Sequence, residues 1–328
     1  MIRAAVIGVG SMGKNHARVF AEMEETELVA VADPARAVPV ADIYKVRPYA
    51  DYREMLAREA PDVVSVVVPT ALHGQVAREA AAAGTHVFVE KPLASSLEEG
   101  RSIIEAARTA DVRLAVGHIE RFNPAVLALR ERLEAGDLGR IFQLHARRVG
   151  PFPSRIEDVG VVFDLATHEL NVMEYLAESA VESLYAETQR AIHPSHEDLL
   201  SGVLKFASGA VGVLDINWLT PTKIRQLSII GERGLFVVNY LTQELFFYEN
   251  DYTNNHWDRL AAIMGVAEGK MVKHGVRRKE PLRAELEEFI ASVREGREPL
   301  VGGEEGLRAV FLAQKMVESG LNRQAVRV

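Results

Sequence analysis

Three glycines near the start of the chain constrain its fold more than any other feature. The segment "VIGVGSMG" carries the pattern G-x-G-x-x-G at Gly8, Gly10 and Gly13, after an apolar strand-like run and before a helical one. In such a context Gly8 permits a tight turn, Gly10 lets a pyrophosphate approach the backbone, and Gly13 lets helix and strand pack closely. Phosphates bind at the helix N-terminus. The sequence therefore predicts a dinucleotide site, with Ser11 and Met12 among its contacts.

An acid in the expected place supports this prediction. Asp33 ends the second predicted strand, where a carboxylate binds the adenosine ribose. A carboxylate accepts hydrogen bonds from ribose hydroxyls and repels a 2′-phosphate, which favours NAD over NADP. Arg36 lies close enough in sequence to weaken this preference. A plain glycine turn with an incidental aspartate is the simpler alternative, but strand, loop, helix and acid all follow in the required order.

The pattern of predicted elements changes near residue 120. Up to that point strands and helices alternate, which predicts βαβ units and a parallel sheet with helices on both faces. Strands and tight turns then dominate from about 181 to 248, and two helices close the chain. The predicted fold class is α/β plus α+β. We expect a doubly wound Rossmann domain at 1–120, and at 121–328 a domain with a large, open, mostly antiparallel sheet and helices on one face.

Composition narrows the classes of function. The 328 residues include no cysteine and carry a formal net charge of −8. Without cysteine, disulfides, thiolate metal sites and a cysteine nucleophile are excluded, and no metal site is predicted. The acids are scattered, which argues against nucleic acid as the main partner. No apolar segment is long enough to cross a bilayer, and the first residues do not resemble a signal peptide. We expect a cytoplasmic protein.

Polar residues follow two further predicted strands. Thr70 and His73 come after "VVSVVVP", and Glu90 and Lys91 come after "HVFV". Ligands of open α/β sheets bind at the carboxyl ends of the strands. A Glu-Lys pair at the end of a buried strand is unusual because charge is costly there, although an isolated pair is more often the start of a solvated loop.

A later segment pairs an acid with a histidine. "GVVFDLATHELNVMEYL" (160–176) has the apolar stripe of an amphipathic helix, with Asp164 and His168 one turn apart on the polar face. The spacing of the residues alone does not decide whether this polar face contacts water or a substrate.

Three motifs together resemble a known family. They are "GVGSMG", "EKP" at 90–92, and G-x-x-x-D-x-x-x-H at Gly160, Asp164 and His168. Over essentially its whole length the chain resembles the glucose–fructose oxidoreductase, inositol dehydrogenase and rhizopine-catabolism (Gfo/Idh/MocA) family. The resemblance implies a Rossmann domain followed by an open-sheet domain. It also implies that Lys91 contacts substrate and cofactor and that the Lys91–Pro92 bond is cis.

The resemblance assigns the remaining catalytic functions as well. His168 corresponds to the acid/base and Asp164 to the carboxylate beside it, while Thr70 and His73 match a loop that flanks the nicotinamide. Oxidation of a secondary alcohol sends a proton to a base, and an unperturbed imidazole has a pKa near 6.5. Whether His168 or Lys91 takes that proton stays open. The predicted NAD contacts are Gly8, Gly10, Ser11, Met12, Gly13, Asp33, Thr70, His73, Glu90 and Lys91.

Two longer segments bear on the substrate. "GHIERFNP" (117–124) and "RRVGPFPSRIEDVGVVFDLATHE" (147–169) resemble UDP-N-acetylglucosamine 3-dehydrogenases and the related UDP-N-acetylglucosaminuronate enzymes. The resemblance implies oxidation of the sugar 3-hydroxyl. Arginine suits a diphosphate, although scattered surface arginines are an equally good explanation for any one of them. The predicted substrate contacts are Arg121, Asn123, Arg147, Arg155, Asp164 and His168. The alternatives are an inositol or free-monosaccharide dehydrogenase and a non-catalytic NAD-binding regulator.

The predicted open sheet needs cover on both faces. The strands "VGVLDINWL" and "LFVVNYL" carry apolar residues on both of their faces. Helices can pack on one face of the sheet, and the other face needs a different cover. We therefore expect a homodimer or homotetramer through the C-terminal sheet. "HPSH" (193–196) is interpreted as a loop, and "KHGVRRK" (273–279) as a solvated linker.

Overall fold

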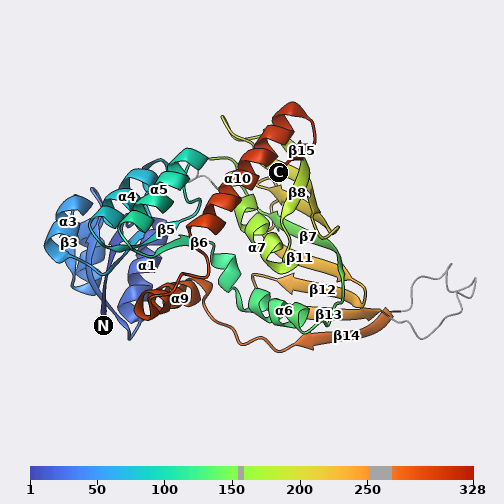
Figure 1. Cartoon of the computed structure of the whole chain (residues 1–328), viewed down its shortest axis with the longest axis horizontal. Helices are drawn as coiled ribbons and strands as arrows, with labels where there is room; N and C mark the ends of the chain where they lie inside the picture. Colours follow the sequence, from blue (N-terminus) through green and yellow to red (C-terminus); the bar gives the residue numbers. More distant parts are fainter. Residues whose placement is uncertain (154–158, 251–267) are drawn as a thin grey trace, which may run out of the picture. The chain divides into compact units, whose positions relative to one another are not determined.

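The chain folds into two compact units, coloured along the sequence in Figure 1. The computed structural model describes residues 1–153, 159–250 and 268–328. Unit 1 comprises Met1–Phe122 with Glu280–Phe311, and unit 2 comprises Asn123–Lys279 with Leu312–Val328. The break after Phe122 lies close to the predicted boundary at residue 120. The return of Glu280–Phe311 to unit 1 differs from the prediction, which assigned the whole of 121–328 to one domain.

Unit 1 is built on a parallel sheet of six strands in the order β3-β2-β1-β4-β5-β6. The strand order reverses between β1 and β4, the place where open α/β sheets bind ligands. Its strands are β1 (Ile2–Ile7), β2 (Thr26–Ala32), β3 (Arg47–Tyr49), β4 (Val63–Val66), β5 (His86–Glu90) and β6 (Leu114–Gly117). Its helices up to Phe122 are α1 (Ser11–Glu22), α2 (Ala37–Tyr44), α3 (Tyr52–Glu59), η1 (Thr70–Leu72), α4 (His73–Ala82), α5 (Leu97–Thr109) and η2 (Ile119–Phe122).

Helix α9 (Pro281–Glu295) belongs to unit 1 because its apolar stripe completes that core. Leu282, Leu286 and Phe289 recur at helical spacing and are buried with residues of β1, β2 and α1. The Phe289 ring meets Phe88 of β5 edge to face, with 5.8 Å between centroids. A long-range contact of this kind leaves no local signal in the sequence. The next helix, α10 (Gly303–Asn322), contributes residues to both units.

Unit 2 is built on a nine-stranded sheet in the order β14-β13-β12-β11-β7-β10-β9-β8-β15. Among the described strands of this sheet, only β7 and β10 pair in parallel, so the sheet is mostly antiparallel. The strands are β7 (Ile141–Val149), β8 (Val181–Gln189), β9 (Leu199–Phe206), β10 (Val211–Asn217), β11 (Ile224–Gly231), β12 (Gly234–Asn239), β13 (Glu244–Asn250), β14 (Glu268–His274) and β15 (Val326–Arg327). The start of the expected linker 273–279 thus lies in β14.

The described helices of unit 2 cover one face of this sheet, as Figure 1 shows for α6 and α7. Besides the part of α10 from Leu312 onward, they are α6 (Pro124–Glu134), the π-helix η3 (Val162–Ala166) and α7 (Thr167–Ala177). The burial of β7 alternates accordingly: Leu144, Ala146 and Arg148 are buried, whereas His145 and Arg147 are exposed. The predicted fold class is confirmed in both units. Within the described residues, no helix combines the length and the apolar character that crossing a membrane requires.

Candidate active site

The glycine loop after β1 has the geometry that a dinucleotide needs. Gly8 has φ +88°, and a Cβ there would lie 2.5 Å from the Val67 carbonyl oxygen. At Gly13 a Cβ would lie 1.8 Å from the Gly8 carbonyl oxygen, so the helix packs on the loop without room for a side chain. Around Gly10, the residue that precedes α1, no atom lies within 4 Å of an added Cβ. Protein atoms therefore fill the space next to Gly8 and Gly13, whereas the space next to Gly10 is empty. This empty space fits an approaching pyrophosphate.

Asp33 stands at the end of β2 and holds this loop. Its Oδ2 accepts from the Val9 N–H at 3.0 Å, and its Oδ1 accepts from the Ala35 and Arg36 N–H groups, each at 2.9 Å. Burial acts to raise the pKa of Asp33, but the three backbone hydrogen bonds and the Arg36 charge outweigh it, so the pKa lies below its ordinary value. The carboxylate is thus ionised and fixed beside the glycine loop, and its contact with a ribose stays a prediction.

Thr70 and His73 follow β4, as the sequence predicts. Thr70 opens η1, while His73 is only 1% exposed. The His73 Nδ1 lies 2.8 Å from the Pro92 carbonyl oxygen and its Nε2 lies 2.9 Å from that of Val68. Burial lowers the pKa of His73, although both carbonyl groups act to raise it. His73 therefore ties the loop after β4 to the loop after β5, and its contact with a nicotinamide stays a prediction.

Glu90 and Lys91 end β5, and the Lys91–Pro92 bond is cis, as expected. Glu90 Oε1 lies 2.9 Å from His16 Nε2, and His16 Nδ1 lies 3.1 Å from Ser65 Oγ. Burial acts to raise the pKa of Glu90, but the His16 hydrogen bond and the Lys91 charge outweigh it and hold the pKa below its ordinary value. Its Oε2 accepts from the Lys91 backbone N–H at 3.1 Å. The carboxylate thus anchors the backbone that carries the Lys91 ammonium.

His118 lies beside Lys91 in the same unit. It is 1% exposed, and burial together with the charges of Lys91 and Arg121 lowers its pKa to about 3. His118 is therefore neutral at physiological pH. From the sequence, we place His118 only at the domain boundary. Because His118 directly follows β6, and ligands bind at the carboxyl ends of parallel strands, the sequence could have indicated a position near the ligand. Arg121, a predicted substrate contact, is placed in η2 next to it.

Asp164 and His168 lie in a segment that is not one regular helix. The π-helix Val162–Ala166 contains Asp164, and α7 begins at Thr167, whose N–H donates to the Val162 carbonyl five residues earlier. His168 is 7% exposed and Thr167 is fully buried. The polar side of the predicted amphipathic helix is thus not a face in water. Single π turns are frequent at functional sites.

The loop that contains "HPSH" supports the start of this segment. The Glu197 carbonyl accepts from the Val161 N–H at 2.9 Å, and Glu197 Oε1 accepts from the Val162 N–H at 3.2 Å. The loop is itself closed by Asp198, whose carboxylate accepts from the N–H groups of Ala191, Ile192 and His193. The loop predicted at this place is confirmed.

The predicted arginine and asparagine contacts have different outcomes. Arg147 is on the sheet face opposite to α7 and pairs with Asp215 at 3.0 Å, so its placement does not support a contact beside His168. Asn123 is 2% exposed; its Oδ1 caps α6 and its Nδ2 donates to the Tyr240 carbonyl at 3.1 Å, so the amide is used inside unit 2. Arg155 lies outside the described residues.

Sequence reasoning missed the significance of the buried neighbour of Arg147. Arg148 is 1% exposed and its Nε donates to Glu169, which is fully buried in the first turn of α7. The hydroxyl of Tyr240 donates to the other Glu169 oxygen at 2.9 Å. The period-two alternation of β7 was a usable signal, because Arg148 shares its face with Leu144 and Ala146.

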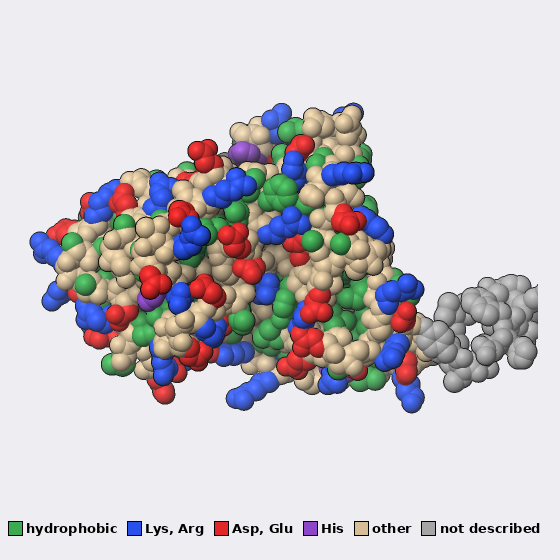
Figure 2. All heavy atoms as spheres, in the orientation of Figure 1, with side chains coloured by type: hydrophobic (Ala, Val, Ile, Leu, Met, Phe, Trp, Pro, Cys, Tyr) green, Lys and Arg blue, Asp and Glu red, His purple; other side chains and the backbone are tan. Residues whose placement is uncertain are grey.

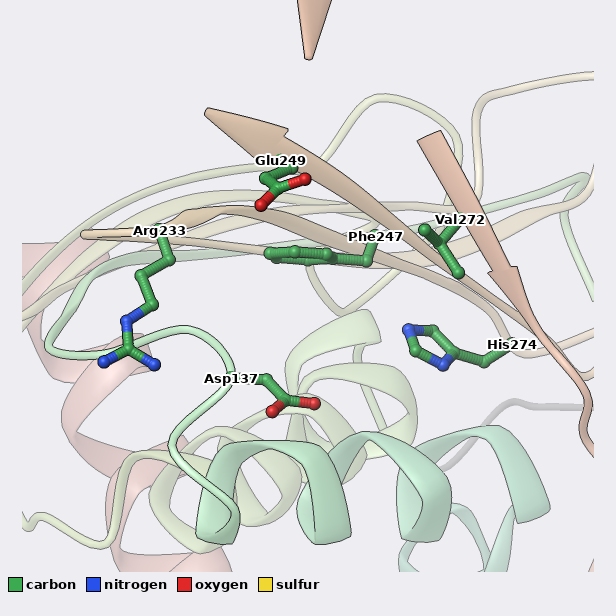
Figure 3. A pocket seen from close by; sticks show the side chains of 6 residues that line it. All are labelled: Asp137, Arg233, Phe247, Glu249, Val272 and His274. Carbon is green, nitrogen blue, oxygen red and sulfur yellow. The ribbon is translucent and has the colours of Figure 1, made fainter. Parts of the chain in front are cut away.

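A cavity of about 250 Å³ lies elsewhere in unit 2, shown in Figure 3. Asp137, on the loop after α6, and His274, on β14, point toward each other beneath the ring of Phe247. Its other lining residues are Arg233, Glu249 and Val272. No predicted site residue lines it. Among the described residues, no group of three or more His, Asp or Glu side chains could hold a metal ion.

Comparison with family models decides the family. Residues 2–118 match the model described as "Oxidoreductase family, NAD-binding Rossmann fold", and residues 126–237 match the "GFO/IDH/MocA C-terminal domain". The chain belongs to the Gfo/Idh/MocA oxidoreductase family. Unit 1 is the NAD-binding Rossmann domain of this family, in agreement with the predicted cofactor and with the open space above Gly10.

Curated relatives cover nearly the whole chain. The chain is 29% identical to the UDP-N-acetylglucosamine 3-dehydrogenase of Acidithiobacillus ferrooxidans, over 98% of this chain and 99% of the relative. A solved structure of that enzyme has a TM-score of 0.85 at 27% identity, with 98% and 99% of the two chains covered. The D-glucoside 3-dehydrogenase of Escherichia coli is 31% identical over 83% of this chain and 89% of the relative. The scyllo-inositol 2-dehydrogenase of Bacillus subtilis is 29% identical, with 92% and 88% covered.

Proposed function

We propose that this protein is an NAD-dependent dehydrogenase that oxidises a secondary hydroxyl of a sugar to a ketone. The observation that carries the proposal is His168, buried in the first turn of α7 with Asp164 four residues earlier, in a chain whose other unit binds NAD. Bound NAD supplies the hydride acceptor. Unit 2 is then the substrate-binding domain.

The chain's own residues manage the proton and the position of the sugar. His168 is the proposed base, because an imidazole exchanges a proton near neutral pH. Asp164 accepts a hydrogen bond from the sugar or from the imidazole, and the Lys91 ammonium donates to the hydroxyl oxygen as negative charge develops on it. Thr70, Glu90 and Lys91 are the proposed contacts on the nicotinamide side, and Asp33 that on the ribose.

The proposed substrate is UDP-N-acetylglucosamine or its uronate, oxidised at the 3-hydroxyl. Similarity to a UDP-N-acetylglucosamine 3-dehydrogenase over 98% of this chain supports this choice. Arg121, directly before unit 2, is the proposed cation for the diphosphate among the described arginines. We place the enzyme in the cytoplasm, where nucleotide sugar and NAD are both present.

A second candidate is a dehydrogenase of free sugars, glucosides or inositols. The 31% identity with a D-glucoside 3-dehydrogenase favours it. Such substrates carry no diphosphate, so they need no arginine to bind one. A non-catalytic regulator on the same fold is the third candidate, and the presence of Lys91, Asp164 and His168 together argues against it.

A substrate panel separates these candidates. The protein is incubated with NAD, and in parallel with NADP, plus UDP-N-acetylglucosamine, its uronate, myo-inositol, methyl glucoside or glucose, and the absorbance of reduced nicotinamide is followed. We expect turnover with NAD and a UDP-sugar, and a product lighter by two hydrogens in mass spectrometry. Turnover with free sugars alone overturns the nucleotide-sugar proposal. NAD binding without reduction by any alcohol favours the regulator.

A further inference from the structure

Three buried side chains of unit 2 meet at the first turn of α7. Arg148 of β7 is 1% exposed, Glu169 of α7 is fully buried, and Tyr240, directly after β12, is 4% exposed. The Arg148 Nε donates to Glu169 Oε1, and the Tyr240 hydroxyl donates to Glu169 Oε2 at 2.9 Å. The Arg148 guanidinium also lies over the Tyr240 ring, 5.5 Å from its centroid. One carboxylate is therefore held from two directions, by strand β7 and by the turn directly after β12.

Stability alone is a poor explanation for this cluster. Taking an arginine and a glutamate out of water costs several kcal/mol per ion, and apolar residues of similar volume often serve a fold equally well or better. What a charged cluster adds is direction, because each hydrogen bond works only over a narrow range of distance and angle. The cluster fixes how the first turn of α7 is rotated about its own axis.

The position of that turn is not fixed by regular helix geometry. The preceding π-helix η3 has a wider turn than an α-helix, so Asp164 and His168 do not keep the spacing that an ideal helix would impose. Glu169 is the residue directly after His168. The cluster is itself tied down, because Asn123 caps α6 with its Oδ1 and donates its Nδ2 to the Tyr240 carbonyl.

We propose that Arg148, Glu169 and Tyr240 are positioning residues that fix the direction of the His168 imidazole. This inference rests on the proposed function of His168 as the base. The three residues act through the first turn of α7 rather than on the sugar. Their loss therefore lowers the rate of proton transfer and leaves the binding of NAD and of the sugar nearly unchanged.

The double variant Arg148→Met/Glu169→Leu tests this, because it removes both charges and keeps the core filled. We expect an unchanged or raised melting temperature, a kcat lower by roughly 10- to 100-fold, and KM values within about two-fold of wild type. The pH profile of kcat shifts as well. Tyr240→Phe, which removes one hydroxyl, gives a smaller change in the same direction and carries the test should the double variant not fold.

Arg130→Met is the control, because Arg130 lies on α6 and contacts the other end of α7. Arg130 donates to the Tyr175 carbonyl at 2.7 Å and pairs with Glu178, the C-cap of α7, so its loss also removes an ion pair that holds this helix. We expect its kcat to stay within about two-fold of wild type. A loss in Arg130→Met equal to that in the cluster variants overturns the inference, since any disturbance of α7 would then suffice.

A second measurement does not depend on turnover. Histidine-selective NMR, with the His168 signal assigned by its absence in His168→Ala, gives the titration midpoint and tautomer of the imidazole. We expect both to change in Tyr240→Phe and to stay unchanged in Arg130→Met. A normal kcat and an unchanged His168 titration in the cluster variants overturn the inference and leave the proposed function intact. Absence of any sugar oxidation by the wild type overturns the proposed function, and the NMR comparison still decides whether the cluster positions His168.

Discussion

Asp33, Glu169 and Glu285 are buried carboxylates with three different sets of neighbours. Asp33 accepts three backbone N–H groups, and Glu169 accepts from Arg148 and Tyr240. Glu285 of α9 is 2% exposed, and neither of its oxygens has a hydrogen-bond partner among the described residues. Backbone hydrogen bonds and the Arg36 charge favour the ionised form of Asp33, whereas burial and nearby carboxylates disfavour the ionised form of Glu285. The surroundings of a buried carboxyl group therefore decide which of its two forms is favoured.

Asp33→Asn should weaken NAD binding by roughly ten-fold or more, because a carboxylate is a stronger acceptor for ribose hydroxyls than an amide. Titration of the variant with NAD, followed by fluorescence or calorimetry, measures this. The variant should also lose some thermal stability, since an amide offers one oxygen where the carboxylate offers two to the three N–H groups. Wild-type affinity for NAD would refute the ribose contact and leave Asp33 with its structural function alone.

Glu285→Gln should stabilise unit 1, and more so as pH rises. Burial, and after it the charges of Glu90, Glu120 and Glu288, hold the pKa of Glu285 well above its ordinary value. Between the unfolded and the folded pKa the native state binds more protons than the unfolded state, so wild-type stability falls with rising pH by up to about 1.4 kcal/mol per unit. Glutamine removes this loss. Urea unfolding at several pH values from about 4 to 8 measures it; a constant difference between variant and wild type would contradict the assignment.

His168→Ala and Lys91→Ala should each lower kcat by roughly 10²- to 10⁴-fold, the range for removal of a group that transfers or stabilises a proton. NAD affinity should change by less than about ten-fold, because the glycine loop and Asp33 remain. Steady-state kinetics with the best sugar of the panel, together with NAD titration, test both. Wild-type turnover in both variants would show that the chemistry lies elsewhere.

At the scale of elements, the glycine loop offers a matched pair of substitutions. Gly13→Ala places a methyl group 1.8 Å from the Gly8 carbonyl oxygen, so the loop and α1 must move apart, at a cost of about 3 kcal/mol or more. Gly10→Ala meets no atom within 4 Å. It should keep the wild-type melting temperature and lose NAD affinity, because the methyl group lies where the pyrophosphate approaches. Thermal melts with and without NAD separate the two effects; a stable Gly10→Ala with normal affinity would contradict the site.

Elements were predictable where the signal is local. The strands predicted from about 181 to 248 are present, β9 and β11 among them, and the glycine loop follows β1 and precedes α1 as predicted. The π-helix was not predictable, because the apolar residues from Val162 to Leu176 have the spacing of a regular amphipathic α-helix. Strand alternation, which places adjacent side chains on opposite faces, could have indicated that Arg147 and Arg148 of β7 face different sides of the sheet.

At the scale of the whole molecule, the contacts between elements far apart in the sequence cannot be predicted from local patterns. Helix α9 completes the unit 1 core although Phe289 and its neighbour Phe88 are 201 residues apart in the sequence, a contact that no local pattern predicts. On the face shown in Figure 2, acidic and basic side chains are interspersed rather than gathered into one field. That arrangement suits the net charge of −8 and a small-molecule substrate better than a polyanionic partner.

The open face of the nine-stranded sheet carries the last prediction. Val203 of β9 is 47% exposed and is paired with Val213 of β10, and Ile230 of β11, 41% exposed, lies on the same face. Exposed apolar residues across several strands, opposite to the face that α6 and α7 cover, are typical of an association surface. We expect a homodimer or homotetramer through this face, and Val203→Lys should dissociate it because lysine is costly to bury. Light scattering coupled to size-exclusion chromatography measures the mass of each variant. Ile43→Lys, at a residue of α2 that is 69% exposed, is the control. An unchanged mass in Val203→Lys, or a wild-type monomer, would place the association surface elsewhere or remove it.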